Sequence, residues 1–207
     1  MRGMAEPQTT FRIADLSPID PYKLASGLIV PRPIGWIGTR SADGVDNLAP
    51  YSFFNLVGSD PVHAAYSPGG GRVRKDSLDN VRAVPEFTIN IVTAETVEAM
   101  NATAASLPAD EDEFDHAGLT KVASTEVAPM RVGEATATME CRVTDIVHVG
   151  NPEGGNGPVI GEILVIHVAD RVLDGTRIKQ DELRAIGRHA GSWYSHTSDL
   201  FAIDRPA

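Results

Sequence analysis

A single cysteine, Cys141, is present among the 207 residues of this chain, so no internal disulfide can form. Cys141 lies in an apolar strand pattern, which predicts a small buried side chain. No apolar run approaches the roughly 20 residues that a membrane-spanning helix needs, and the N-terminal stretch has no apolar signal core. These absences argue against a membrane protein and give no sign of an oxidising compartment. We therefore expect a cytoplasmic location.

Positive charge is also scarce, because 28 acidic residues outnumber 18 lysines and arginines and give a net charge of −10. A protein that binds nucleic acid or an anionic membrane needs a basic face, so we expect neither partner. An acidic protein that binds an anionic ligand has to concentrate its positive charge locally. One cluster does so, with Arg72, Arg74 and Lys75 in the segment GGGRVRKD.

Several catalytic and cofactor motifs are missing as well. The chain has no Gly-x-Gly-x-x-Gly after a strand, no Walker loop and no Gly-x-Ser-x-Gly elbow. Its six histidines never pair as His-x-x-x-His, and with one cysteine we expect no metal site. His148 and His167 fall on two adjacent predicted strands, and we interpret them as strand histidines that face solvent or are hydrogen-bonded.

The chain does contain many short strand patterns separated by turn signals. We predict strands at 34–40, 47–51, 62–67, 87–92, 135–149, 159–169 and 177–179, and helices at 77–83 and 94–105. Asp76 and Thr93 are the expected caps of the two helices, and residues 21–25 allow one helical turn. This pattern favours a mainly β, antiparallel barrel with inserted helices. We expect one domain over residues 1–207, with a loose tail at 1–10.

Three segments carry finer predictions. Asp43-Gly44 predicts a type I′ hairpin turn, which needs positive φ at both central residues. Within 135–149, alternate residues from Ala135 to Val143 predict one apolar face. The acidic stretch 107–118 is expected at the surface as a loop or a short helix.

The most informative segment is 31–55, PRPIGWIGTRSADGVDNLAPYSFFN. It predicts a hairpin followed by a polar and aromatic loop, in which Pro50 stops regular pairing and Ser52 offers a hydroxyl. Such a segment can hold a flat ligand with polar edges. The alternative is an ordinary hairpin with an aromatic cluster that fills the core.

Three blocks of this sequence, RPIGWIGT, NLAPYSFFN and KDSLDN, resemble the flavin reductase-like family of FMN-binding split barrels. The resemblance runs from about Ile29 to Tyr194 and is most specific between Arg32 and Phe54. It implies a split β-barrel with Greek-key connections, usually a homodimer with flavin at the subunit interface. It also implies FMN as the cofactor, with FAD as the alternative, and NADH or NADPH as the reductant.

The same resemblance implies a set of site residues. Those expected around the flavin ring are Arg32, Trp36, Thr39, Asn47, Ala49, Pro50, Ser52, Phe53 and Phe54. Those expected around the phosphate, where a cation, hydroxyls and a helix start suit an anion, are Ser67, Lys75, Asp76, Ser77 and Asn80. Those expected near the nicotinamide are His189, which faces its ring, Tyr194, which caps the site, and Arg188, which helps to bind an anionic cofactor.

Several of these assignments have an alternative that the residues leave open. Trp36 also fits a core or dimer-interface position, His189 a surface loop, and Tyr194 plain packing. The segment 72–77 also fits a capped surface helix beside solvated arginines. Because a carboxylate repels phosphate, Asp76 is expected to hold the helix start and orient Lys75.

The function implied is an NAD(P)H-dependent flavin reductase, in which hydride passes from the nicotinamide to flavin N5. The reduced flavin would then serve a partner monooxygenase, another electron acceptor or oxygen. Two alternatives stay open: an FMN-binding electron carrier without a nicotinamide site, and a non-catalytic split-barrel binding module.

Overall fold

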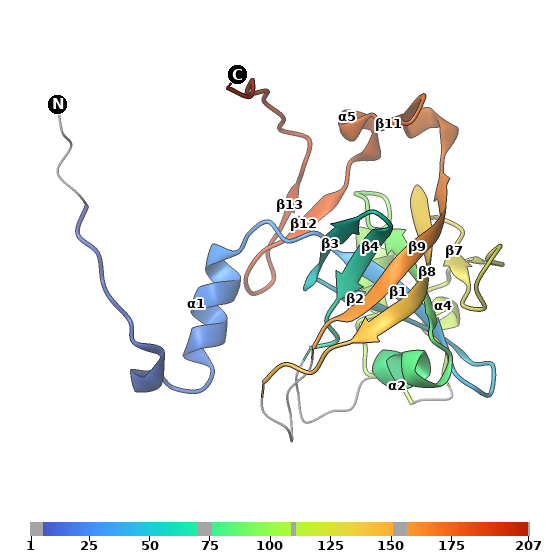
Figure 1. Cartoon of the computed structure of the whole chain (residues 1–207), viewed down its shortest axis with the longest axis horizontal. Coiled ribbons are helices and arrows are strands. Elements are labelled where there is room, and N and C mark those ends of the chain that lie inside the picture. Colours follow the sequence, from blue (N-terminus) through green and yellow to red (C-terminus); the bar gives the residue numbers. More distant parts are fainter. Residues whose placement is uncertain (1–5, 70–75, 109–110, 151–156, 207) are drawn as a thin grey trace.

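The computed structural model describes residues 6–69, 76–108, 111–150 and 157–206. Its main element is one sheet of seven strands in the order β2-β1-β5-β8-β9-β4-β3, with every neighbouring pair antiparallel (Figure 1). These strands are β1 (Gly35–Arg40), β2 (Asp46–Tyr51), β3 (Phe54–Ser59), β4 (Val62–Tyr66), β5 (Glu86–Ile91), β8 (Ala137–Ile146) and β9 (Val159–Val168). The predicted mainly β, antiparallel fold is confirmed.

The sheet curls because two residues, Ser52 and Phe53, join β2 to β3 although these strands are its two edges. The edges must therefore approach each other at that end. The helices around the sheet are α1 (Asp20–Leu28), α2 (Asp76–Ala83), α3 (Val97–Ala102), α4 (Glu113–His116), α5 (Gln180–Leu183) and the 3₁₀ turns η1 (Ile13–Asp15) and η2 (Asp170–Val172). Three small strand pairs complete the fold: β6 (Lys121–Val122) with β7 (Arg131–Val132), β10 (Leu173–Asp174) with β11 (Arg177–Ile178), and β12 (Ile186–Arg188) with β13 (Tyr194–His196). In Figure 1, α1 and the N-terminal segment project away from the sheet.

The side chains of β1 alternate between two hydrophobic clusters, as the two-residue period of a strand requires. Ile37 packs in a cluster with Phe87, and Trp36 packs in a second cluster with Phe114. Cys141 belongs to the first cluster and has no exposed surface, which confirms its predicted burial. Burial raises the pKa of this thiol well above its usual value, so Cys141 stays protonated and unreactive.

The turn between β1 and β2 is not the predicted type I′ turn. Gly44 N donates to Ser41 O (3.0 Å), and Ser41 N donates to Val45 O (2.8 Å). Gly44 has a φ of 88°, but Asp43 is not among the non-glycine residues with positive φ. The chain therefore forms a type I turn followed by a left-handed glycine, which is another common way to close a hairpin.

Other boundaries differ from the prediction. β3 was not predicted, because a bulge between Leu56 and Gly58 interrupts the alternation that marks a strand. The helix expected at 94–105 forms only at Val97–Ala102, and α1 is longer than the single turn expected at 21–25. Asp76 is the first residue of α2 rather than its cap, a position where a carboxylate is favoured by the helix dipole.

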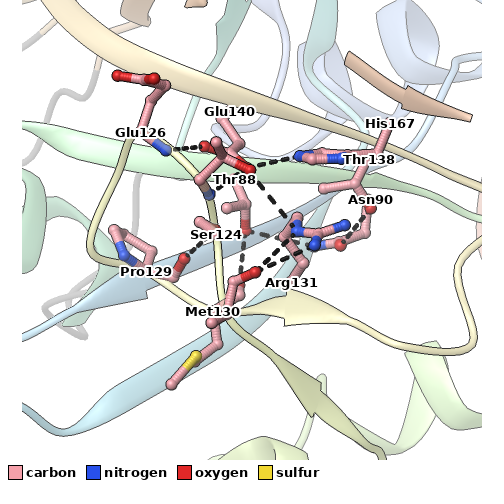
Figure 2. Close-up of polar contacts among 12 residues, drawn as sticks. Thr88, Asn90, Ser124, Glu126, Pro129, Met130, Arg131, Thr138, Glu140 and His167 are labelled. Atoms are coloured by element: carbon pink, nitrogen blue, oxygen red, sulfur yellow. Dashed lines mark hydrogen bonds and ion pairs between the residues drawn. The ribbon is translucent and has the colours of Figure 1, made fainter. Parts of the chain in front are cut away.

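Met139, Cys141 and Val143 pack on one hydrophobic cluster, in line with the apolar face predicted for β8, but the opposite face is also buried near the middle of the strand. Glu140 has no exposed surface, and its carboxylate accepts from Thr125 N (2.8 Å), Glu126 N (2.7 Å) and His167 Nε2 (2.6 Å) (Figure 2). Arg131 Nε lies 3.8 Å from the same carboxylate. Burial alone would raise the pKa of Glu140, but these hydrogen bonds outweigh it and lower that pKa. Glu140 thus anchors the segment before β7 to the sheet.

We predict that Glu140→Gln lowers the free energy of unfolding by about 3 kcal/mol at neutral pH, because a buried network loses its anion. The folded-state pKa of Glu140 lies below its ordinary value of 4.5. The contribution of Glu140 to the free energy of unfolding is therefore present above pH 4.5 and is lost as the pH falls through the lower folded-state pKa. Urea unfolding at neutral and acid pH should show the difference between variant and parent shrinking in acid.

Glu86→Gln is the matched control for this prediction. Glu86 also holds the covering segment, but by a single bond from Ala128 N (2.8 Å) near the surface. Its loss should cost less than about 1 kcal/mol. Equal losses in the two variants would contradict the role given to Glu140.

Candidate functional site

Two adjoining cavities lie beside the end of β2. The larger, about 540 Å³, is enclosed by α1, the end of β2, α3 and the turn between β12 and β13. The smaller, about 140 Å³, lies between β2, the start of α2 and the segment after α3. Pro50 and Ala104 line both, so the two spaces meet at these residues. A third cavity, about 390 Å³ and mainly apolar, lies between α1 and the start of β3.

The structure distributes the predicted site residues over these spaces. The larger cavity takes Arg32, Pro50, Ser52, His189 and Tyr194. The smaller takes Asn47, Ala49, Pro50, Asp76 and Ser77. The third takes Phe53 and Phe54, together with Arg32 and Ser52.

The remaining predicted residues lie elsewhere. Trp36, Thr39 and Ser67 line none of the three cavities, and Asn80 lines a separate acidic one. Ser67 follows β4, where its N–H donates to Phe53 O (2.8 Å). Lys75 lies outside the described residues. The predicted ring and phosphate residues are thus brought together only in part.

Four of the predicted cofactor residues are bonded to one another. Asn47 Oδ1 accepts from Thr39 Oγ1 (3.1 Å) and from Ser77 Oγ (2.8 Å). Asn80 Nδ2 donates to Thr39 Oγ1 (3.1 Å), and the Tyr51 hydroxyl donates to Ser77 Oγ (2.8 Å). Burial raises the pKa of Tyr51 to about 12, so its hydroxyl remains a donor. These side chains tie β1, β2 and α2 together beside the smaller cavity.

Glu113 anchors this network, although its stretch was expected at the surface. Its carboxylate accepts from Asn47 Nδ2 at 2.8 and 2.9 Å and from Leu48 N at 2.9 Å. Glu113 is 7% exposed, and burial raises the pKa of its carboxyl group. Its neighbour Phe114 has no exposed surface, so core packing brings α4 and Glu113 against β2. Phe114, an aromatic within an acidic stretch, is the sequence signal that indicates this burial.

Arg32 holds α1 and the C-terminal segment against the larger cavity. Its Nη1 donates to Ser26 O (2.6 Å) and Ile29 O (2.8 Å) at the end of α1. Its Nη2 donates to His189 O (2.9 Å), and its Nε donates to Ser52 Oγ (3.2 Å). Because most of its donors are used within the protein, Arg32 offers a ligand positive charge rather than several new hydrogen bonds.

Trp36 lies in the core and lines none of the three cavities, so its predicted contact with the flavin stays a prediction. The indole N–H donates to Thr103 Oγ1 (2.9 Å), and the side chain has no exposed surface. The side chain thus occupies the core position given above as the alternative. An aromatic residue in a strand gives the same sequence pattern whether it packs in the core or contacts a ligand, so the sequence alone does not separate these two roles.

The turn between β12 and β13 forms one wall of the larger cavity. His189 is partly buried, and its Nε2 is bonded to Ser195 Oγ (2.9 Å). The Arg188 guanidinium lies over the Tyr194 ring, 4.4 Å from the ring centroid. The structure thus brings all three C-terminal candidates, Arg188, His189 and Tyr194, to the same cavity as Arg32.

We predict that Glu113→Ala lowers the free energy of unfolding by about 2–3 kcal/mol, since Asn47 Nδ2 and Leu48 N lose their acceptor in a buried place. Glu113→Gln should cost less, because its amide oxygen still accepts. The raised pKa means that the contribution of Glu113 to stability grows as the pH falls through the raised value, opposite in sign to Glu140. Urea unfolding across the acid range measures both effects. Equal losses in the alanine and glutamine variants would argue against this network.

Comparison with known proteins gives a consistent result. Residues 27–186 match the family described as Flavin reductase like domain. An uncharacterized protein of Aquifex aeolicus is 39% identical over 176 residues, which cover 84% of this chain and 88% of that protein. Nitrilotriacetate monooxygenase component B from Bacillus cereus superposes with a TM-score of 0.92 at 32% identity, over 96% of this chain and 100% of that chain. A protein with a split barrel domain from Shewanella frigidimarina superposes with a TM-score of 0.81 at 22% identity, over 93% and 96% of the two chains. This chain therefore belongs to the flavin reductase-like family and has a split-barrel fold.

Proposed function

We propose that this protein is a flavin-binding oxidoreductase that reduces a flavin with a nicotinamide dinucleotide. The pair of cavities that meet at Pro50 and Ala104 carries the proposal. The smaller cavity contains the start of α2, and the larger cavity has a wall that contains His189 and Tyr194. The larger, about 540 Å³, lies within the range of about 300–1,000 Å³ that ligand sites usually occupy.

The smaller cavity suits the phosphate end of FMN. Asp76 and Ser77 line it and form the first turn of α2. The first N–H groups of a helix lack intrahelical partners and favour an anion. At about 140 Å³ this space suits a phosphate better than a phosphate with an adenylate beyond it, so we propose FMN rather than FAD. Lys75 stays a candidate for the same phosphate, outside the described residues.

The larger cavity suits the flavin ring and the nicotinamide. Apolar Ile34 and Met100, aromatic Tyr194, and polar Ser52 and His189 line it. This mixture fits a flat ring with one apolar and one polar edge. A bound flavin would supply the redox chemistry by accepting hydride from a dihydronicotinamide at N5. The residues of this chain would bind and align the two rings and limit the access of water, so no general base is needed.

The buried network beside the smaller cavity has a positioning role in this proposal. Thr39 and Asn80 bond to neighbouring side chains, and Asn47 bonds to Glu113. We propose that Thr39, Asn47 and Asn80 maintain the shape of the cavity wall, whereas Ala49 and Pro50 form its surface. Phe53 and Phe54 line the third cavity, and we do not place them at the ring.

A monooxygenase is the partner that we propose for the reduced flavin. The Bacillus cereus protein is named as a component of nitrilotriacetate monooxygenase. That name would fit a pair of proteins in which one reduces the flavin and the other uses the reduced flavin to react with oxygen. Among the described residues, no helix is long and apolar enough to cross a membrane. The cytoplasmic location expected from the sequence stays a prediction.

A homodimer is the assembly that we propose. Large apolar side chains are exposed on the N-terminal segment and α1, on the β2–β3 link and β3, and on the β12–β13 turn and the C-terminal segment: Ile13, Ile19, Leu28, Ile29, Phe53, Leu56, Val57, Trp193, Leu200, Phe201 and Ile203. So many exposed apolar groups are typical of a surface that is covered by a partner. Because α1 also bounds the larger cavity, a second copy packed on this surface would close part of that cavity.

We predict that the purified protein binds FMN and loses its flavin absorbance when NADH or NADPH is added without oxygen. Ala104→Trp should weaken FMN binding at least about tenfold, because exposed Ala104 stands where the two cavities meet. Glu98→Trp, on the exposed face of α3, is the matched control. Flavin titration and anaerobic absorbance spectra measure the two effects. A yellow protein that neither nicotinamide reduces would point to an electron carrier, and a protein that binds no FMN would point to a non-catalytic module.

We predict that sedimentation equilibrium gives twice the mass of one chain. Leu28→Asp should shift the protein towards a single chain, because Leu28 is 82% exposed on α1 and a charge there opposes burial. Val149→Asp is the control, since Val149 is exposed beyond the end of β8, outside this surface. A parent protein that sediments as one chain at all concentrations would reject the dimer.

A further inference from the structure

The last described residues, 198–206, are not held by the rest of their own chain. Thr197 is the last residue that is bonded, and its N–H (3.3 Å) and its Oγ1 (2.8 Å) both donate to Ala185 O. Within the described chain, residues 198–206 form no hydrogen bond, ion pair or ring contact, and this C-terminal segment runs away from the sheet (Figure 1). The fold of a single copy therefore does nothing to offset the cost of ordering the segment.

The C-terminal segment is nevertheless apolar. Leu200, Phe201 and Ile203 fall within four residues and are all exposed, Phe201 by 84%. Segments that stay solvated are usually poor in large apolar residues. An exposed apolar cluster of this kind is typical of a surface that packs against another protein.

The third cavity, between α1 and the start of β3, offers an apolar surface of suitable size. It measures about 390 Å³, and Ile29, Pro31 and Phe54 are among the residues that line it. The rings of Tyr22 and Phe53, which also line it, have centroids 6.5 Å apart and are about half exposed. None of the residues 198–206 lines this cavity in the single chain.

The cavity and the C-terminal segment match in charge and in backbone chemistry as well. Arg32 is the one charged residue in the described lining, and its printed partners are carbonyl and hydroxyl oxygens. The segment supplies a carboxylate at Asp199, next to Leu200. β3 is an edge strand, and such a strand presents unpaired backbone groups to an extended chain.

A second copy of this chain is the occupant that the surroundings of the cavity favour. Exposed Leu28 on α1 and exposed Leu56 on β3 continue the apolar surface beyond the cavity. This surface is the one on which we place the homodimer. A two-fold axis would bring the segment of each copy to the cavity of the other, so both contacts would form at once.

We infer that the C-terminal segment of each copy fills the third cavity of a second copy of this chain. Phe201 and its apolar neighbours enter the cavity, and Asp199 faces Arg32. Because Ser26, Arg32 and Ser52 line both this cavity and the larger one, the segment packs against a wall of the candidate flavin site. The inference rests on the homodimer of the proposed function and names the segment that forms it.

The first test is a crosslink between introduced cysteines. A chain that carries both Ile29→Cys and Phe201→Cys is treated with a short bismaleimide and run on a denaturing gel. Cys141 has no exposed surface and does not compete. We expect a covalent dimer of twice the chain mass, and the same product when the two single variants are mixed. Val149→Cys in place of Phe201→Cys is the matched control and should give no dimer, since Val149 is exposed beyond the end of β8.

The second test measures the strength of the dimer by sedimentation equilibrium. Phe201→Asp should raise the dissociation constant of the dimer at least about tenfold, because a charge opposes burial in an apolar cavity. Its circular dichroism should match the parent, since residue 201 is not bonded within its own chain. Ala25→Trp, which fills the cavity from α1, should weaken the dimer similarly. Ala83→Trp, at the exposed end of α2, is its matched control.

The possible outcomes separate the inference from the proposed function. A crosslink that forms only within one chain would mean that the segment folds onto its own cavity, and this would overturn the inference. A dimer that neither crosslinks nor responds to Phe201→Asp would keep the homodimer and reject the segment as its contact. A chain that stays single at all concentrations would reject both. Neither test needs flavin or nicotinamide, so a failure of flavin reduction would reject the proposed activity and leave this inference standing or falling on the crosslink.

Discussion

The short link between β2 and β3 is the constraint on which the site depends. Ser52 and Phe53 alone join strands that form opposite edges of the sheet, so the sheet has to curl. The curl puts the end of β2 beside α1, α3 and the β12–β13 turn, and these elements enclose the larger cavity. Pro50 lies in this edge strand and lacks an N–H, which disfavours pairing with a further strand. This edge of β2 is thereby left accessible to a ligand.

Three buried charges show how framework and site differ. Glu140 accepts from two backbone N–H groups and His167, and Glu113 accepts from Asn47 and Leu48 N. Both carboxylates are satisfied by donors of the chain itself, so each holds a loop or strand in place. Arg32 is as deeply buried and, like Glu113, is held by neutral groups, whereas Glu140 also has His167 and Arg131 beside it. Arg32 differs from the two carboxylates in its place, because it alone of the three lines the larger cavity.

The sequence predicts the strands and the fold class well because these depend on local patterns, as in 62–67 and 159–169. It misses β3, where a bulge breaks the alternation, and it assigns the wrong turn at Gly44, because Asp-Gly fits two turn types. The site is predicted less well. Arg32 meets His189 across 157 residues and Asn47 meets Glu113 across 66, and such contacts leave no local pattern. Residues that carry the resemblance therefore include core and framework groups as well as lining groups.

The walls of the two cavities are held in place in different ways. The framework around the smaller cavity lies within residues 27–186, the part shared with the family, and it fixes β1, β2 and α2. One wall of the larger cavity is formed by α1 and the β12–β13 turn, which Arg32 attaches through backbone carbonyls. Carbonyl oxygens are present whatever the side chains are, so this attachment does not depend on the residues at 23 and 188. The side chains of this wall can thus change while the smaller cavity keeps its shape.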